Sequence, residues 1–215
     1  MSDLTQPPVI PEFDTKFVSY FMLMAAFGHV TIRDHNRRAW LLSAVATTII
    51  SLLGSIELVR WALNPYALSD ILISTMLVEI LKAYLLVDLV YSALWHPDQL
   101  ELVDGWIHHV VYIVVMENLQ QSYQIHCTRP LWVAEIPAAI RAWTALGVIS
   151  PRVSNRWFGA TFVAFRIVWP AYVITQILSQ MWVFCFVGLT IVVHTGWFAI
   201  WMWRRNTRLV LDGEL

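Results

Sequence analysis

The chain has 215 residues, of which 58% are hydrophobic and only 13% are charged. An ordinary soluble domain has about 25% charged residues, so this composition excludes a soluble globule and predicts a membrane protein. The formal net charge is −1 and no long basic block is present, which argues against nucleic acid as a partner. The two cysteines, Cys127 and Cys185, have no CxxC or CxxH spacing, so we expect no metal site and no cofactor.

Apolar runs of about 20 residues, the length that crosses the hydrocarbon core of a bilayer as a helix, recur seven times along the chain. The proline-rich residues 1–15 form an N-terminal tail with the wrong charge order for a signal peptide, so we expect the first run to be retained. Tryptophans and Pro-containing connectors mark the ends of the runs. The predicted spans are 16–32, 40–63, 71–95, 105–123, 131–149, 157–178 and 182–203.

The loop cations predict the orientation of these spans. Eight arginines follow spans one, five and seven, whereas only Lys16, Arg60 and Arg129 lie at the opposite ends. The positive-inside rule therefore places the C-terminal tail, residues 204–215, in the cytosol.

Ionisable residues inside the predicted spans indicate a polar interior, because each costs about 2.5 to 3.5 kcal/mol at bilayer depth unless it is paired or has a function. They are Glu57, Glu79, Lys82, Asp88, His108, His109, Glu117, Glu135, Arg141, Arg166 and His194. We expect Asp88, His108, His109, Arg141 and Arg166 to converge on one cavity in the cytosolic half.

Some of these residues have simpler interpretations. Glu79 and Lys82 are three residues apart and can form a local salt bridge, and His194 on an aromatic helix is often a hydrogen-bonded packing residue. Arg141 and Arg166 either tie helices together through acidic partners or bind an anion or a lipid headgroup.

The adjacent pair His108-His109 is the strongest candidate for chemistry. Side chains of neighbouring helix residues diverge by about 100°, so the two cannot bind one metal as an HExxH pair does. One imidazole can act as general base or nucleophile if a carboxylate such as Asp88 fixes its tautomer. The alternative is two polar residues at an interfacial helix start. We find no GxSxG, P-loop or GxGxxG pattern beside the pair.

The order of these polar landmarks resembles the TLC-domain family, named for the translocating-chain-associated membrane protein, Lag1 and a neuronal lipofuscinosis protein. The resemblance covers residues 36–203, with 16–35 as an additional first helix. It rests on the segments Asn36-Arg37-Arg38-Ala39-Trp40, Tyr84 to Leu89, His108-His109, Ala134 to Pro137, Arg141-Ala142-Trp143 and Phe165 to Pro170. It implies an all-α membrane protein with a six-helix bundle around a lipid-accessible cavity.

The resemblance leaves three functions open. The chain departs from the ceramide synthase branch in the spacing to Ser122-Tyr123, and is closest in pattern to the small TLC-domain proteins. It is therefore expected to be a multi-pass protein of the endoplasmic reticulum or another endomembrane that binds or handles lipid in lipid homeostasis, with Glu135, Arg141, Arg166 and His194 at the lipid or its headgroup. The first alternative is an acyltransferase that uses acyl-CoA, with Asp88 orienting and His108, chosen on the resemblance, or His109 reacting. The second is a non-catalytic trafficking or translocation adaptor.

Overall fold

The computed structural model describes residues 15–63, 71–98, 100, 102–121, 125–176 and 181–211. Throughout these residues the chain is helical and has no strand, which confirms the all-α class. The elements are α1 (Thr15–Thr31), α2 (His35–Ala39), α3 (Leu41–Leu63), α4 (Ile71–Trp95), η2 (Leu102–Ile107), α5 (His108–Gln121), η3 (Ile125–Glu135), α6 (Ile136–Ala145), α7 (Pro151–Phe162), η4 (Val163–Val168), α8 (Trp169–Gln176) and α9 (Met181–Leu211).

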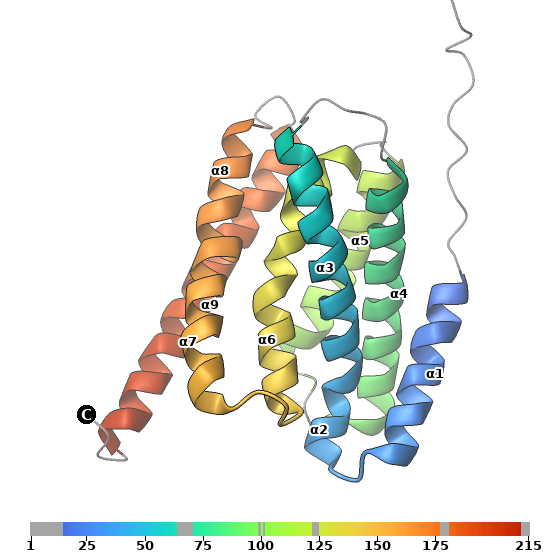
Figure 1. Ribbon diagram of the computed structural model, residues 1–215, viewed down its shortest axis with the longest axis vertical. Coiled ribbons are helices and arrows are strands. Elements are labelled where there is room, and N and C mark those ends of the chain that lie inside the picture. Colours follow the sequence, from blue (N-terminus) through green and yellow to red (C-terminus); the bar gives the residue numbers. More distant parts are fainter. Residues whose placement is uncertain are drawn as a thin grey trace, which may run out of the picture.

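The helices form an elongated bundle (Figure 1). α3 lies against α4, α6 and η3, α1 packs on α4, and α5 packs on the other side of α4. α7, η4 and α8 follow one another as a single rod beside α6, and α9 runs with α8 before its last turns diverge from the bundle.

Several boundaries differ from those that the sequence predicts. The helix expected from residue 157 begins at Pro151, because proline fits the first turn of a helix, where its missing N–H has no intrahelical acceptor. The preceding connector turns at Gly147, whose φ of 81° is in the left-handed region that favours glycine. The last helix continues past residue 203 to Leu211, where a tail was expected.

One helix among the described residues, His35–Leu63, is long and apolar enough to cross a membrane by length and composition alone. α4 has 25 residues but carries Glu79, Lys82 and Asp88, and the chain from 102 to 176 is divided into shorter or irregular segments. The criterion of an uninterrupted apolar helix therefore leaves six of the seven predicted spans unconfirmed.

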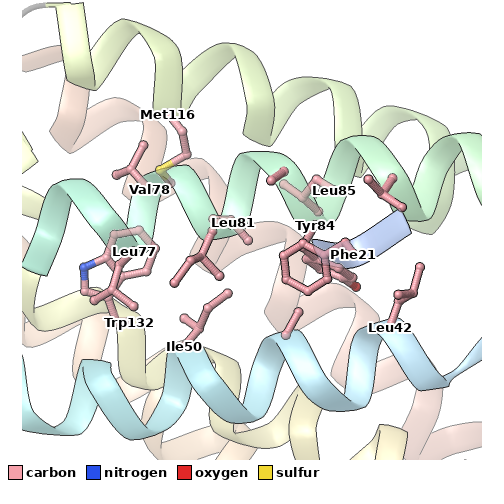
Figure 2. Packing of buried hydrophobic residues seen from close by; sticks show 14 of the residues in the cluster. Phe21, Leu42, Ile50, Leu77, Val78, Leu81, Tyr84, Leu85, Met116 and Trp132 are labelled. Carbon is pink, nitrogen blue, oxygen red and sulfur yellow. The ribbon is translucent and has the colours of Figure 1, made fainter. Parts of the chain in front are cut away.

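The apolar core lies where α1, α3, α4, α5 and η3 meet. Figure 2 shows Phe21 of α1 beside Tyr84 of α4, and Trp132 of η3 beside Leu77 of α4. η3 approaches α3 so closely that a Cβ built on Gly54 would lie 3.1 Å from the backbone carbonyl carbon of Trp132. This close crossing fixes η3 against α3 and so positions the residues at the end of η3.

Candidate functional site

A buried hydrogen bond between two ionisable residues joins α4 to the start of α5. His109 Nε2 lies 3.0 Å from Asp88 Oδ2, and both residues are buried, with 6% and 7% of their surface exposed. Since a carboxylate only accepts, His109 donates through Nε2, which leaves Nδ1 as the basic nitrogen of a neutral imidazole. The other carboxylate oxygen, Asp88 Oδ1, is buried and has no hydrogen-bond partner among the described residues. Asp88 is thus placed to orient His109.

His108 has different contacts from His109. The two rings have an interplanar angle of 74°, and the His108 ring lies against Tyr112, with their centroids 4.4 Å apart. Arg166 and His194 are close enough to interact electrostatically with His108. The sequence interpretation chose His108 as the reacting residue, whereas the histidine that contacts Asp88 is His109.

Arg166 links three elements. Its Nε donates to the carbonyl oxygen of Ala134 at 2.8 Å, one Nη lies 3.3 Å from His194 Nε2, and the other lies 3.8 Å from Glu135 Oε2. Because a guanidinium only donates, His194 Nε2 is the acceptor, and its Nδ1 carries the proton. His194 also hydrogen-bonds the backbone of Thr190. Arg166 therefore gathers η3, η4 and α9 around one charge.

The residues that make these contacts lie in or next to irregular helical segments. Glu135 ends the 3₁₀ segment η3, Arg166 lies in the π-helical η4, and His108 directly follows the π-helical η2. In the 3₁₀ pattern the carbonyl of Ala134 would accept from residue 137, but this residue is Pro137, which has no N–H. The Arg166 guanidinium takes the place of that donor.

Arg141 is placed differently from the other predicted site residues. Its guanidinium carbon lies 5.1 Å from the centre of the Trp40 ring and 5.5 Å from that of Trp197. Stacking between two indoles holds Arg141 through cation–π attraction. The described contacts thus bring Asp88 to His109, and Arg166 to Glu135 and His194, whereas Arg141 stacks on aromatic rings.

A second polar cluster lies further along the contact between α4 and α5. Lys82 Nζ is 2.9 Å from Glu79 Oε1, 2.9 Å from Glu117 Oε2 and 2.6 Å from Gln120 Oε1. Gln120 also donates to Glu79 at 2.7 Å. The local Glu79–Lys82 pair was expected from its spacing, but Gln120 was missed, although it is one turn from Glu117 on the same helix.

Two tyrosines near the histidines were also missed. Tyr84 is buried one turn before Asp88, and its hydroxyl is 2.9 Å from that of Ser43, while Tyr112 follows His108 by four residues. The i,i+4 spacing to a predicted site residue was the available signal, because such residues share a helix face.

Family models, curated proteins and solved structures contain no match to this chain. Among the described residues no group of three or more His, Cys, Asp or Glu side chains has the arrangement of a metal site. The chemistry available from the residues described here is acid–base chemistry by an Asp-oriented imidazole and anion recognition by an arginine.

Proposed function

We propose that this chain is a multi-pass membrane protein that binds a lipid at the interior polar site and acts in the lipid homeostasis of an endomembrane such as the endoplasmic reticulum. The observation that carries the proposal is that paired ionisable groups, Asp88–His109 and Arg166–His194, lie within a bundle whose outer helix faces are apolar. The resemblance to the TLC family is the reason for proposing a lipid as the ligand.

The outer face of α3 supports insertion in a bilayer. Leu52, Ile56, Val59 and Leu63 recur at i, i+4, i+7 and i+11, and each exposes half or more of its surface. Val110, Val111 and Val114 of α5 are likewise exposed. Contiguous apolar stripes of this kind are rare on monomeric soluble proteins, and lipid chains would cover them. The charges of α4 do not oppose insertion, because they are paired inside the bundle rather than facing outward.

We propose that Arg166 binds the lipid headgroup. A guanidinium forms charge-assisted hydrogen bonds with phosphate or carboxylate oxygens, and the flanking Glu135 and His194 orient it. The Arg166 side chain is 16% exposed, so it is shielded from bulk water. An anionic or zwitterionic headgroup fits this combination.

Acyl transfer is the second candidate, and the Asp88–His109 pair favours it. With acyl-CoA as donor, His109 would take the proton from a lipid amine or hydroxyl as that group attacks the thioester carbonyl. The new amide or ester bond forms as the C–S bond breaks, and the imidazolium returns the proton to the leaving thiolate. Asp88 would hold the imidazole in the required tautomer and stabilise its charged form.

Lipid binding is tested on the full chain purified in detergent, with the lipids that co-purify identified by mass spectrometry. Arg166→Gln is expected to lose most of the bound lipid, whereas Arg156→Gln, at an exposed position on α7, keeps it. Equal lipid content in the two variants would contradict the proposal and favour the adaptor alternative.

Acyl transfer is tested in the same preparation with radiolabelled acyl-CoA and a long-chain amine. Activity that falls by about 10⁴-fold in His109→Ala and Asp88→Asn would establish the second candidate, in line with the loss on removing a catalytic dyad member. If the parent protein binds lipid but transfers no acyl group, acyl transfer is rejected and lipid binding remains as the proposed function.

Topology is tested separately by thiol labelling at an added C-terminal cysteine and at one in residues 64–70. The charge asymmetry predicts a cytosolic C-terminus, with residues 64–70 on the opposite side. Equal accessibility of both sites from the cytosol would contradict the seven-span arrangement.

A further inference from the structure

We infer that a pocket at the end of the bundle, where the α1–α2 connection meets the turn after α6, binds a phosphate ester. The pocket has a volume of about 420 Å³ and is lined by Thr31, Ile32, Arg33, Asp34, Arg37 and Leu146. None of these residues belongs to the Asp88–His109 or Arg166 site. The inference is thus independent of the lipid site proposed above.

The net charge of the residues that line the pocket favours an anionic ligand. Two arginines and one aspartate contribute a net charge of +1. Asp34 neutralises Arg37 only weakly, because Asp34 Oδ2 lies 3.5 Å from Arg37 Nε and both side chains are about half exposed. A phosphate can replace the Asp34 carboxylate as the partner of Arg37 in such an exposed pair, because its oxygens match the paired N–H donors of a guanidinium.

The surrounding backbone fixes the position of Arg37. The Asp34 carboxylate accepts from the Arg37 backbone N–H at 3.2 Å, which caps α2 and holds the connection in place. On the other side Gly147 comes so near that a Cβ there would lie 3.2 to 3.4 Å from the guanidinium carbon and both terminal nitrogens. The left-handed turn at Gly147 therefore leaves room for the guanidinium at the pocket wall.

The pocket lies where two sources of a phosphate ester are within reach. It lies at the end of the bundle that carries Trp40 and Trp95, side chains that prefer the headgroup level of a bilayer. A phosphate there comes either from a phospholipid headgroup or from the nucleotide part of a soluble coenzyme such as CoA. Both present the same phosphate ester chemistry to Arg33 and Arg37, and a volume of this size accommodates either group.

The experiment titrates the full chain in detergent with two pairs of probes, read by microscale thermophoresis. Dihexanoylphosphatidic acid is compared with dihexanoylglycerol, and CoA with an equimolar mixture of adenosine and pantetheine, so that the members of each pair differ in their phosphates. We expect the phosphate-bearing member of at least one pair to bind, with an affinity that falls as salt is added. Preference for the lipid probe identifies a headgroup site, and preference for CoA identifies a coenzyme site.

Variants of the lining provide the second readout. Arg37→Gln is expected to weaken binding by about 10-fold or more, because a charge-assisted hydrogen bond is lost, and Arg33→Gln acts in the same direction. Gly147→Ala is expected to displace the guanidinium and to weaken binding as well. Arg156→Gln is the matched control for the loss of one positive charge. Circular dichroism and thermal unfolding establish that each variant is folded.

Three results would overturn the inference. One is that no phosphate probe binds at millimolar concentration. Another is that the phosphate-free probes bind equally well. The third is that the folded Arg33 and Arg37 variants bind like the parent protein. The lipid that co-purifies with the Arg33 and Arg37 variants is measured as well and is expected to stay at the parent level, so failure here is distinguishable from failure of the interior lipid site.

Discussion

Replacement of Gly54 by alanine tests the close crossing of α3 and η3. The added Cβ would meet the side chain of Trp132 and would lie 3.1 and 3.3 Å from its backbone carbonyl carbon and Cα. Backbone atoms cannot rotate away, so the helices must separate, which puts the cost near the upper end of the overpacking range, about 3 kcal/mol. Alanine regains about 1 kcal/mol of helix propensity. The net loss is about 2 kcal/mol, or a Tm lower by about 4 to 8 °C in thermal unfolding in detergent.

Two other glycines supply the control for Gly54. Gly159 on α7 and Gly196 on α9 are also helical, but a Cβ at either position meets nothing within 4 Å. Alanine there is expected to leave Tm unchanged or to raise it by about 2 °C, since only the helix propensity changes. If Gly54→Ala shifts Tm in the same direction and by the same amount as these two variants, the close approach of η3 to α3 is refuted.

Three further predictions concern the charged and irregular positions. Lys82→Met leaves the buried Glu79 carboxylate without its cation and is expected to destabilise the protein by about 3 to 5 kcal/mol in urea unfolding, with partial recovery when Glu79→Gln is added. Burial, and then the nearby His35 and Arg38, lower the pKa of His96 from its ordinary 6.5, so the unfolded chain binds a proton more readily. The stability of the protein therefore falls as the pH drops below about 6.5, and the Tm of His96→Gln should depend less on pH in that range. Pro137→Ala supplies an N–H that competes for the carbonyl used by Arg166, and co-purified lipid is expected to fall while Tm changes little.

The parts of the fold that could be predicted are those that depend on continuous apolar runs. The runs at 40–63 and 71–95 correspond to α3 and α4 within one residue, because a proline or a polar connector limits each run. The length of these runs, about 20 residues each, likewise predicts helices and so the all-α class. Hydropathy alone, however, gives no sign that a run such as 157–178 contains two α-helices joined by a π-helical segment.

The contacts of the candidate site could be predicted only in part. Arg141 and Arg166 have the same residue type and comparable positions in apolar runs, yet one stacks between indoles and the other binds a backbone carbonyl. The difference arises from Pro137 and from the π-helical turn around Arg166, which are features of backbone geometry. The choice between His108 and His109 likewise depends on the rotation of α5 about its axis, which residue spacing does not determine.

That rotation is fixed by polar contacts at both ends of the α4–α5 contact. His109, Met116 and Gln120 recur at i, i+7 and i+11, so they form one buried stripe on α5. Each end of the stripe has a charged partner on α4, Asp88 for His109 and Glu79 for Gln120, and apolar packing around Met116 separates them.

Apolar side chains tolerate a shift of one residue better than these pairs do. In the register in which His108 would meet Asp88, Leu119 would take the place of Gln120, and the hydrogen bonds of Gln120 with Glu79 and Lys82 would be lost. The Gln120 cluster, distant along α5 from the histidines, therefore selects the register in which His109 rather than His108 meets Asp88. The same reasoning makes Gln120 a positioning residue, because its hydrogen bonds act on the candidate site only through the register of α5.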